Sequence, residues 1–303
     1  MRGSAPHFHR IPTRFSDCHA PNLPTATAFL SPLALSHSVQ SAVAVSTKQF
    51  WTEVQLRTLP ARMPLELQEV DSETDFPSLA RCLFESYEKP PQRFFHVFFP
   101  IHGTTEGDRE EAIYEAAVRL KLWHTHDPSS YWQKVVDTKT GRIAGGALWN
   151  IHKENPFASP PASEVTWFPN DGSRRFVEKA LENHARPRSQ VAQRPHLYLF
   201  IVFTHPDYRR KGVGQQFMDW GIKKADEMGV EFFLDSTPYG RPLYEANGFE
   251  YIEENVNIPV TEAPDEEWKA VEDKVGPFTF WLMWRPVSGK YGAGKTARPW
   301  ETD

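Results

Sequence analysis

Residues 204–215 read THPDYRRKGVGQ, and this stretch decides the fold. It follows Leu197–Thr204, a nearly unbroken apolar run of strand length, which is typical of a strand buried on both faces. The residues after it place apolar side chains on one face at helical spacing: Val213, Phe217, Trp220, Gly221, Ala225 and Met228. The pattern therefore predicts a buried strand, a glycine-containing turn and a helix that packs on the sheet.

The predicted turn has the features of an anion site. Unpaired N–H groups and the positive end of the helix dipole attract negative charge at a helix N-terminus. Gly212 and Gly214 allow an anion to approach the backbone closely. Three consecutive cations at 209–211 strengthen the field in an otherwise acidic region. We therefore expect a polyphosphate ligand.

The spacing of the glycines selects among polyphosphate sites. A dinucleotide fingerprint would need G-x-G-x-x-G directly after a strand near the start of a βαβ unit. Here Arg209, Gly212 and Gly214 form R-x-x-G-x-G, which resembles the pyrophosphate loop of the GNAT acyltransferases, Q/R-x-x-G-x-G/A. Residues 235–249, DSTPYGRPLYEANGF, are similar to the family's following segment of strand, short helix and next strand.

The resemblance covers about residues 64–285, and its specific motifs lie within 196–250. It implies an α/β fold with the GNAT arrangement, a single domain in which helices flank a mixed, strongly twisted sheet of six or seven strands. It also implies an N-acetyltransferase that moves an acetyl group from acetyl-CoA to an amine by direct attack in a ternary complex, with no metal.

The resemblance further implies how acetyl-CoA is held. The strand before the loop is expected to diverge from its neighbour and to pair with the pantetheine arm. The loop amides are expected to cradle the pyrophosphate, and a polar residue of the following strand to lie near the arm. The implied contact residues are Val202, Phe203, Thr204, Arg209, Arg210, Lys211, Gly212, Val213, Gly214, Gln215 and Ser236.

Tyr244 occupies the position of the family's usual general acid. Amine attack on a thioester expels a thiolate, and a phenol with a pKa near 10 protonates a thiolate whose parent pKa is near 8.5 only if it is held close to the sulfur. The alternative is a core tyrosine that packs its helix against the sheet. The general base is left open, because residues 197–204 contain no carboxylate; the candidates are Asp235, His205, His196 and a water chain.

The acceptor side is less defined. A phenylalanine-rich stretch at 94–99, Trp123 and a mixed segment at 152–194 either enclose an apolar substrate pocket or pack on the sheet. An enclosed cleft favours a small-molecule amine over a protein. Protein or peptide N-acetylation and a non-catalytic protein that binds CoA remain alternatives.

Composition limits the partners. The 303 residues are 40% hydrophobic and 24% charged, as in ordinary globular proteins. A net charge of -5 argues against a general nucleic-acid partner. Cys18 and Cys82 are too few for a disulfide framework or a cysteine zinc site, and they suit a reducing compartment. No apolar stretch approaches the roughly 18 to 20 residues of a membrane span, so no membrane partner is expected. We expect a cytoplasmic protein. Oligomeric state is not predicted.

The charge divides the chain into three parts. Residues 1–62 carry six Lys or Arg and two acids, lack periodicity and are rich in proline. We interpret them as a disordered leader or a mis-assigned start before Met63, with a mitochondrial transit peptide as the alternative. The acyltransferase-like domain is expected at 63–287, with an insertion at 152–194, and a flexible basic tail at 288–303.

Coarse patterns predict the remaining elements of the domain. A strand is expected from Leu65 to Val70, followed by a helix that carries Phe76 and Leu83 on one face. A second helix is expected at about 108–122, a hairpin at 132–137 and 143–151, and a charged helix at 173–184.

Three other motifs are weighed and set aside. Residues 289–296 satisfy the P-loop pattern G-x-x-x-x-G-K-[ST], but only seven residues follow, too few for the required helix and strand. His124 and His126 are metal-type ligands in what we interpret as a surface turn. Cys82 lies on the apolar face of a predicted helix and is interpreted as a core residue.

Overall fold

A seven-stranded sheet forms the centre of the protein in the computed structural model, which describes residues 64–158, 165–289 and 298–300. The described residues belong to one compact unit, Arg62–Asp303. The predictions for the leader at 1–62 and for most of the P-loop-like stretch, at 290–296, lie outside the described residues.

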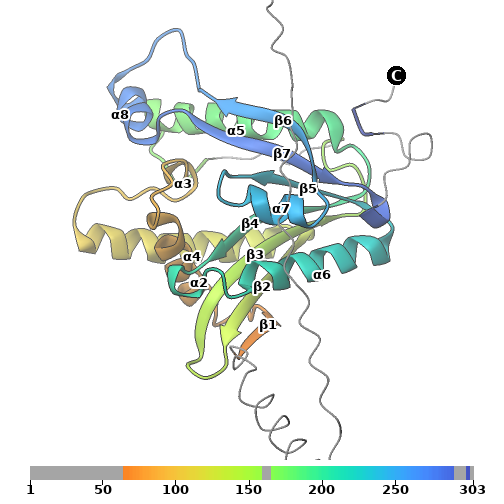
Figure 1. Ribbon diagram of the computed structural model, residues 1–303. Coiled ribbons are helices and arrows are strands. Elements are labelled where there is room, and N and C mark those ends of the chain that lie inside the picture. Colours follow the sequence, from red (N-terminus) through yellow and green to blue (C-terminus); the bar gives the residue numbers. More distant parts are fainter. Residues whose placement is uncertain (1–63, 159–164, 290–297, 301–303) are drawn as a thin grey trace, which may run out of the picture. The chain divides into compact units, whose positions relative to one another are not determined.

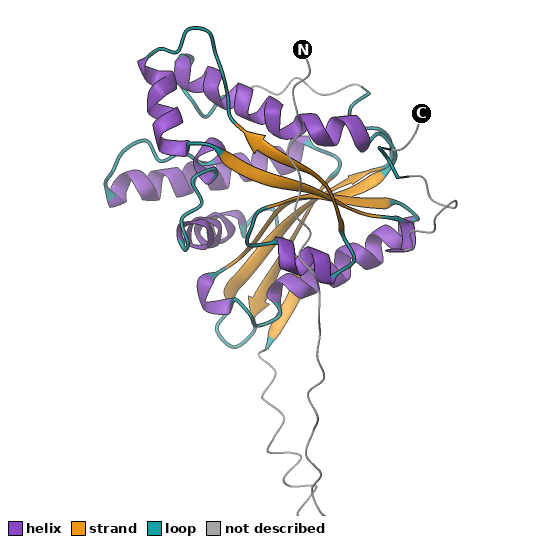
Figure 2. Ribbon diagram, turned by 45° about the horizontal axis from the view of Figure 1, so that its top comes forward, coloured by secondary structure: helices purple, strands orange, loops and turns teal. Residues whose placement is uncertain are grey.

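The strands follow the order β1-β2-β3-β4-β5-β7-β6, in which β4 and β5 are parallel and the other neighbours are antiparallel (Figure 1). Their bounds are β1 Leu65–Glu69, β2 Ser130–Asp137, β3 Arg142–His152, β4 His196–Thr204, β5 Glu231–Ser236, β6 Glu250–Asn257 and β7 Phe278–Arg285. Figure 2 shows the two halves of this twisted sheet spreading apart. The predicted mixed α/β fold is confirmed.

Helices cover both faces of the sheet (Figure 1). They are α2 Phe76–Glu88, α3 Phe95–Phe98, α4 Glu106–His126, α5 Gly172–Val191, α6 Val213–Met228, α7 Arg241–Ala246 and α8 Glu266–Val275. Phe217 of α6 and Tyr244 of α7 share one apolar cluster with Leu199 and Leu234 of the central strands. The clusters under α2, α4, α5 and α8 lie on the opposite side of the strands. The sheet therefore separates two layers of helices.

The two central strands, β4 and β5, diverge near their carboxyl ends. The pairing of β4 with β5 ends at Leu199 and Leu234, whereas β4 stays paired with β3 as far as Thr204. The register between β3 and β4 shifts at the same place, because Trp149 faces Leu199 and Leu148 faces Ile201. Phe200 is the extra residue of this β-bulge, and bulges increase local twist. An unpaired edge of β4 therefore opens toward β5.

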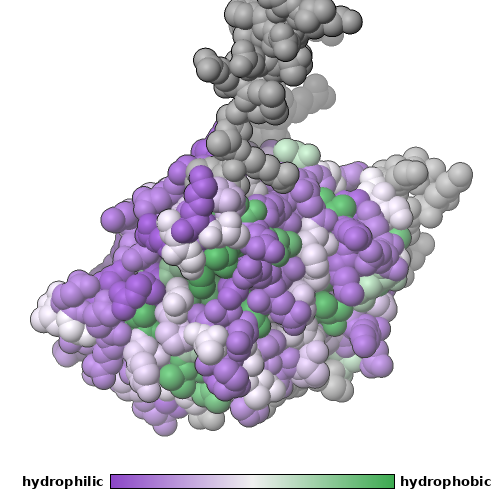
Figure 3. Space-filling view, turned by 90° about the horizontal axis from the view of Figure 1, so that it is seen from below, coloured by the Kyte–Doolittle hydropathy of each residue, from purple (hydrophilic) through white to green (hydrophobic). Residues whose placement is uncertain are grey.

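Most of the predicted elements are confirmed, with shifted ends. The helix expected at 108–122 runs over Glu106–His126, because Thr105 and Asp108 form a capping box at its start. The charged helix expected at 173–184 extends to Val191 through Pro187. The face in Figure 3 is mainly hydrophilic with small separate apolar areas. Within the described ranges no helix is long and apolar enough to cross a bilayer.

Candidate active site

The loop between β4 and α6 is built around residues with left-handed backbone. After the short 3-10 helix Pro206–Tyr208, Arg210 has φ +61° and Gly212 has φ +88°. Gly212 is the N-cap residue of α6 and offers no side chain to the first amides of that helix. In the described residues, no backbone acceptor pairs with the amides of residues 210–212. Turns of this kind direct several N–H groups to one point and bind anions.

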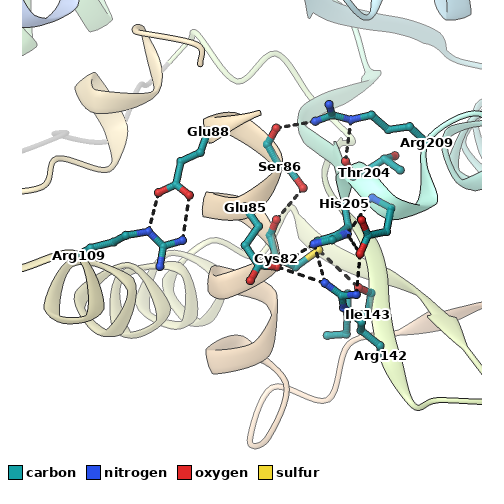
Figure 4. Close-up of polar contacts among 11 residues, drawn as sticks. Cys82, Glu85, Ser86, Glu88, Arg109, Arg142, Ile143, Thr204, His205 and Arg209 are labelled. Atoms are coloured by element: carbon teal, nitrogen blue, oxygen red, sulfur yellow. Dashed lines mark hydrogen bonds and ion pairs between the residues drawn. The ribbon is translucent and has the colours of Figure 1, made fainter. Parts of the chain in front are cut away.

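The Arg209 side chain is turned away from this concave loop. Its guanidinium donates to the Ser86 carbonyl at 2.7 Å and to the Thr204 carbonyl at 3.3 Å (Figure 4). It also donates to the carbonyl of Lys89. Three backbone acceptors on α2 and β4 therefore hold the first cation of the motif. Arg209 therefore anchors the start of the loop, and its guanidinium is hydrogen-bonded to protein carbonyls and does not point toward an anion in the loop.

Two predicted contact residues are not at the cavity that adjoins the loop. The Ser236 side chain is 0% exposed and donates to the Thr237 carbonyl at 2.8 Å. Lys211 lies over the Tyr208 ring, with Nζ 5.5 Å from its centroid. Neither residue lines the cavity. The structure therefore brings the other nine predicted contact residues together there, and leaves Ser236 and Lys211 outside.

The cavity has a volume of about 650 Å³ and runs from the loop into the opening between β4 and β5. Its walls include Leu199–Thr204 of β4 and the N-terminus of α6. The Tyr87 hydroxyl of α2 donates to the Val202 carbonyl at 3.2 Å inside this opening. Tyr87 therefore already satisfies one carbonyl of the strand edge.

Tyr244 reaches the same cavity from α7 and is 5% exposed. Two glycines make this position possible. An added Cβ at Gly240 would lie 2.7 Å from Tyr244 Cε2, and one at Gly214 would lie 3.0 Å from Leu243 Cδ2, so the short helix packs closely on the loop. Burial raises the pKa of Tyr244 above its ordinary value. The phenol is therefore protonated at neutral pH.

The far end of the cavity is aromatic. The rings that line it come from α2, α3, β4 and β7 and from the two residues that flank α3: Tyr87, Phe94, Phe95, Phe98, Phe99, Phe200 and Phe280. Two polar side chains stand among them, His184 of α5 and Asp235 of β5. The segment interpreted as an insertion therefore contributes to the cavity, and the phenylalanine-rich stretch both lines it and packs on the sheet.

The three residues named as possible bases are placed differently. His205 lies under the loop, where Nε2 is 2.9 Å from Glu85 and the ring also contacts Arg142 (Figure 4). His196 begins β4 at the end away from the loop and is 0% exposed. Neither lines the cavity, whereas Asp235 does. Asp235 Oδ2 already accepts from Arg188 at 3.0 Å and from Tyr198 at 2.7 Å.

Two cavity residues, Tyr87 and His184, did not emerge from the sequence. Tyr87 lies one helical turn after Leu83, so the apolar spacing of α2 was a signal for a buried tyrosine. His184 had no such signal, because it lies in a charged helix far from the motif.

The set-aside motifs are resolved in part. The prediction that His124 and His126 lie in a surface turn is wrong. Both residues lie in the last turn of α4, because the helix continues to His126. Within the described residues no group of three or more His, Cys, Asp or Glu side chains is arranged to hold a metal ion. Cys82 is a core residue, as predicted: it is 5% exposed, and burial raises its pKa to about 12.

Residues 91–249 match the model of the acetyltransferase (GNAT) family. The matched region contains the parallel strand pair, the loop, α6, α7 and both polar cavity residues. The match spans more than half of the 303 residues, and the chain belongs to this family.

Solved structures with a similar fold include a histone acetyltransferase HPA2 and related acetyltransferase from Corynebacterium glutamicum, at 18% identity and TM-score 0.45, covering 74% of this chain and 97% of that chain. A polyamine N-acetyltransferase of Drosophila melanogaster matches at 12% identity and TM-score 0.47, covering 74% and 100%. A phosphinothricin acetyltransferase of Sinorhizobium meliloti in complex with AcCoA matches at 14% identity and TM-score 0.39, covering 77% and 93%.

Proposed function

We propose that the protein transfers the acetyl group of acetyl-CoA to the primary amine of a small molecule. The observation that carries this proposal is the position of the opening between β4 and β5, which leads directly from the anion-binding loop to Tyr244 within one cavity. A thioester with a polyphosphate tail requires an elongated site of this kind, with phosphate donors at one end and the reacting carbon at the other.

The residues present fit acetyl-CoA. The amides of Arg210 to Gln215 face the N-terminal end of α6, where the dipole favours a pyrophosphate. No atom lies within 4 Å of a Cβ added at Gly212, so a phosphate has room to approach the backbone. The edge of β4 from Val202 to Thr204 has no β5 partner and is open to pairing with a pantetheine arm. Since the Val202 and Thr204 carbonyls already accept from Tyr87 and Arg209, the arm would share these acceptors through their second lone pairs or use the remaining backbone groups.

The chemistry balances with Tyr244 as the acid. The amine nitrogen attacks the thioester carbonyl carbon, a C–N bond forms and the C–S bond breaks, and the electron pair leaves on sulfur. Tyr244 donates its hydroxyl proton to the thiolate. Burial raises the pKa of the phenol, and the same apolar surroundings raise the pKa of a thiol formed beside it, so the thiolate also binds a proton more tightly.

The lining of the cavity favours a small apolar amine as acceptor. Aromatic rings surround the end beyond β4, and an ammonium group gains from contact with aromatic faces. A screen of purified protein with acetyl-CoA and a panel of 2-phenylethylamine, tryptamine, spermidine and a lysine-containing peptide tests this, with release of free thiol as the readout. If the peptide is turned over fastest, the proposal changes to protein N-acetylation. If no compound of the panel causes release of free thiol, the proposal of catalysis is contradicted.

Replacement of Tyr244 by Phe tests the catalytic assignment. Burial and the neighbouring Tyr87, and no hydrogen bond, account for the raised pKa of this hydroxyl, so Tyr244→Phe should leave stability and acetyl-CoA affinity nearly unchanged. Turnover should fall by about a hundredfold or more, the usual range for loss of a general acid. Tyr131→Phe is the matched control, since that ring stacks on Trp220 outside the cavity. Unchanged turnover in Tyr244→Phe would show that Tyr244 is a packing residue. Absence of thiol release by the wild type, with acetyl-CoA still bound, would favour a non-catalytic CoA-binding protein.

A further inference from the structure

The buried histidine of α5 has an unexplained ring nitrogen. His184 is 8% exposed and lines the cavity, and its Nδ1 is buried with no hydrogen-bond partner in the described part of the chain. A buried polar atom left without a partner costs about 1 to 3 kcal/mol. Because the residue lines the cavity, a bound ligand is the partner that we expect for this buried atom.

The other ring nitrogen faces a buried carboxylate. His184 Nε2 lies 3.7 Å from Asp235 Oδ2, too far for a hydrogen bond but within ion-pair distance. Asp235 is held rigidly by Arg188 and by the Tyr198 hydroxyl, and its side chain is 5% exposed. Asp235 therefore contributes little to a neutral His184 ring and stabilises the protonated ring.

The surroundings keep the ring neutral at rest. Burial is the largest effect and lowers the pKa of His184; Asp235 raises it and Arg188 lowers it again. The remaining neighbours are uncharged: Phe280, 4.7 Å away between ring centroids, and Phe98, at 6.2 Å. The net pKa lies below the ordinary value of histidine, so one ring nitrogen has a free lone pair at neutral pH.

His184 and Tyr244 approach the opening from opposite faces of the sheet. Asp235 is the first residue after the last pair of β4 and β5, at the point where the strands diverge. Leu234 faces the layer that contains Tyr244, and Phe233 belongs to another cluster. Because side chains alternate along a strand, Asp235 faces away from the Tyr244 layer, toward α5. A base on one side and an acid on the other match the entry of the amine and the exit of the sulfur.

We propose that His184, through Nδ1, is the general base that takes a proton from the acceptor ammonium, with Asp235 as its positioning residue. The assignment rests on the proposed function. The nitrogen loses two protons in all: His184 holds the first while the C–N bond forms and then releases it to solvent, and the second restores the proton that Tyr244 supplies to sulfur. The C–N bond forms only after the first proton has left, because an ammonium has no lone pair.

The test is the pH profile of kcat/KM for His184→Gln and wild type, from pH 6 to 10, with the fastest amine of the panel. With a base, the wild-type profile is level between the depressed pKa of His184 and the pKa of the amine. Without one, only free amine reacts, and kcat/KM rises tenfold per pH unit. A primary alkylamine has a pKa of about 10, as lysine does, so this slope spans about three pH units above pH 7. We therefore expect His184→Gln to lose about a thousandfold at pH 7, to rise with that slope and to meet the wild type near the pKa of the amine.

Controls separate this assignment from folding and from the proposed function. His152→Gln alters a partly buried histidine of β3 outside the cavity and should keep the level profile. Thermal unfolding and acetyl-CoA affinity of His184→Gln should match the wild type. If that variant does not fold, the wild-type profile alone decides, because a tenfold rise per pH unit overturns the assignment. A level profile in His184→Gln also overturns it and leaves the transferase intact. No turnover by wild type with any amine overturns both.

Discussion

The two ends of the cavity are built in different ways. The loop end uses consecutive residues, 204–215, and offers backbone amides whose direction is fixed by left-handed residues such as Gly212. The aromatic end uses side chains from separate elements, among them Phe98 of α3, His184 of α5 and Phe280 of β7. A ligand common to a family can be bound by the backbone, whereas selection of an acceptor requires side chains that vary independently.

The largest expected effect breaks the loop end alone. Valine at Gly212 disfavours φ +88°, because a β-branched residue rarely adopts left-handed backbone. Loss of two charge-assisted hydrogen bonds of about 1.5 kcal/mol each predicts acetyl-CoA affinity about a hundredfold weaker. Calorimetric titration with acetyl-CoA measures this.

The matched control for Gly212 is Gly141→Val. Gly141 has φ +73°, has no atom within 4 Å of an added Cβ, and lies in the β2–β3 turn outside the cavity. It therefore carries the same backbone strain without touching the loop. Equal loss of affinity in both variants would mean that Gly212 acts through general stability.

An intermediate effect separates structure from charge within the loop. Arg209→Ala removes three hydrogen bonds from a guanidinium to backbone carbonyls and should lower the free energy of unfolding by about 2 kcal/mol. Lys211→Ala removes the same charge from the same loop and should leave stability nearly unchanged, because Lys211 is exposed and its contact with the Tyr208 ring is a surface cation–π contact. Urea unfolding of both variants tests the contrast, and equal stabilities would contradict it.

The smallest effect breaks the aromatic end alone. Phe98 packs edge-on against His184 and Phe200, with centroids 6.2 and 6.4 Å away. Phe98→Ala should raise KM for 2-phenylethylamine about tenfold, the range for one lost apolar contact, with acetyl-CoA affinity unchanged. Tyr114→Ala, at a 70% exposed position of α4, is the control. A change in acetyl-CoA affinity and none in KM would mean that the two ends are not independent.

The same contrast explains what the sequence predicted. The loop, α6 and β4 followed from local patterns, because strand and helix periodicity and glycine spacing are properties of consecutive residues. The role of Arg209 did not follow, since its acceptors, the Ser86 and Lys89 carbonyls, are more than a hundred residues away. Ser236 was expected near the cofactor arm, yet its side chain is buried outside the cavity.

His184 shows the limit most clearly. Nothing within α5 marks it, and its meaning depends on Asp235, 51 residues later in the printed sequence, and on rings from α3 and β7. The pairing of a histidine with a carboxylate across two elements is a property of the assembled fold. Sequence reasoning placed Asp235 among the possible bases because the motif region contains it, and missed the residue that Asp235 faces.

The bulge at Phe200 changes which face each later residue of β4 presents. Leu197 and Leu199 pack on the α6 side, and strict alternation would send Ile201 there as well. Instead Ile201 and Phe203 pack beneath α2 and α4, and Val202 returns to the α6 side. One added residue thus exchanges, halfway along β4, the sheet faces that the odd-numbered and even-numbered side chains occupy. Without the bulge, regular alternation through Phe200 would place Ile201 and Phe203 on the α6 face and Val202 on the α2 face. The cavity lining would then change although no residue had been replaced.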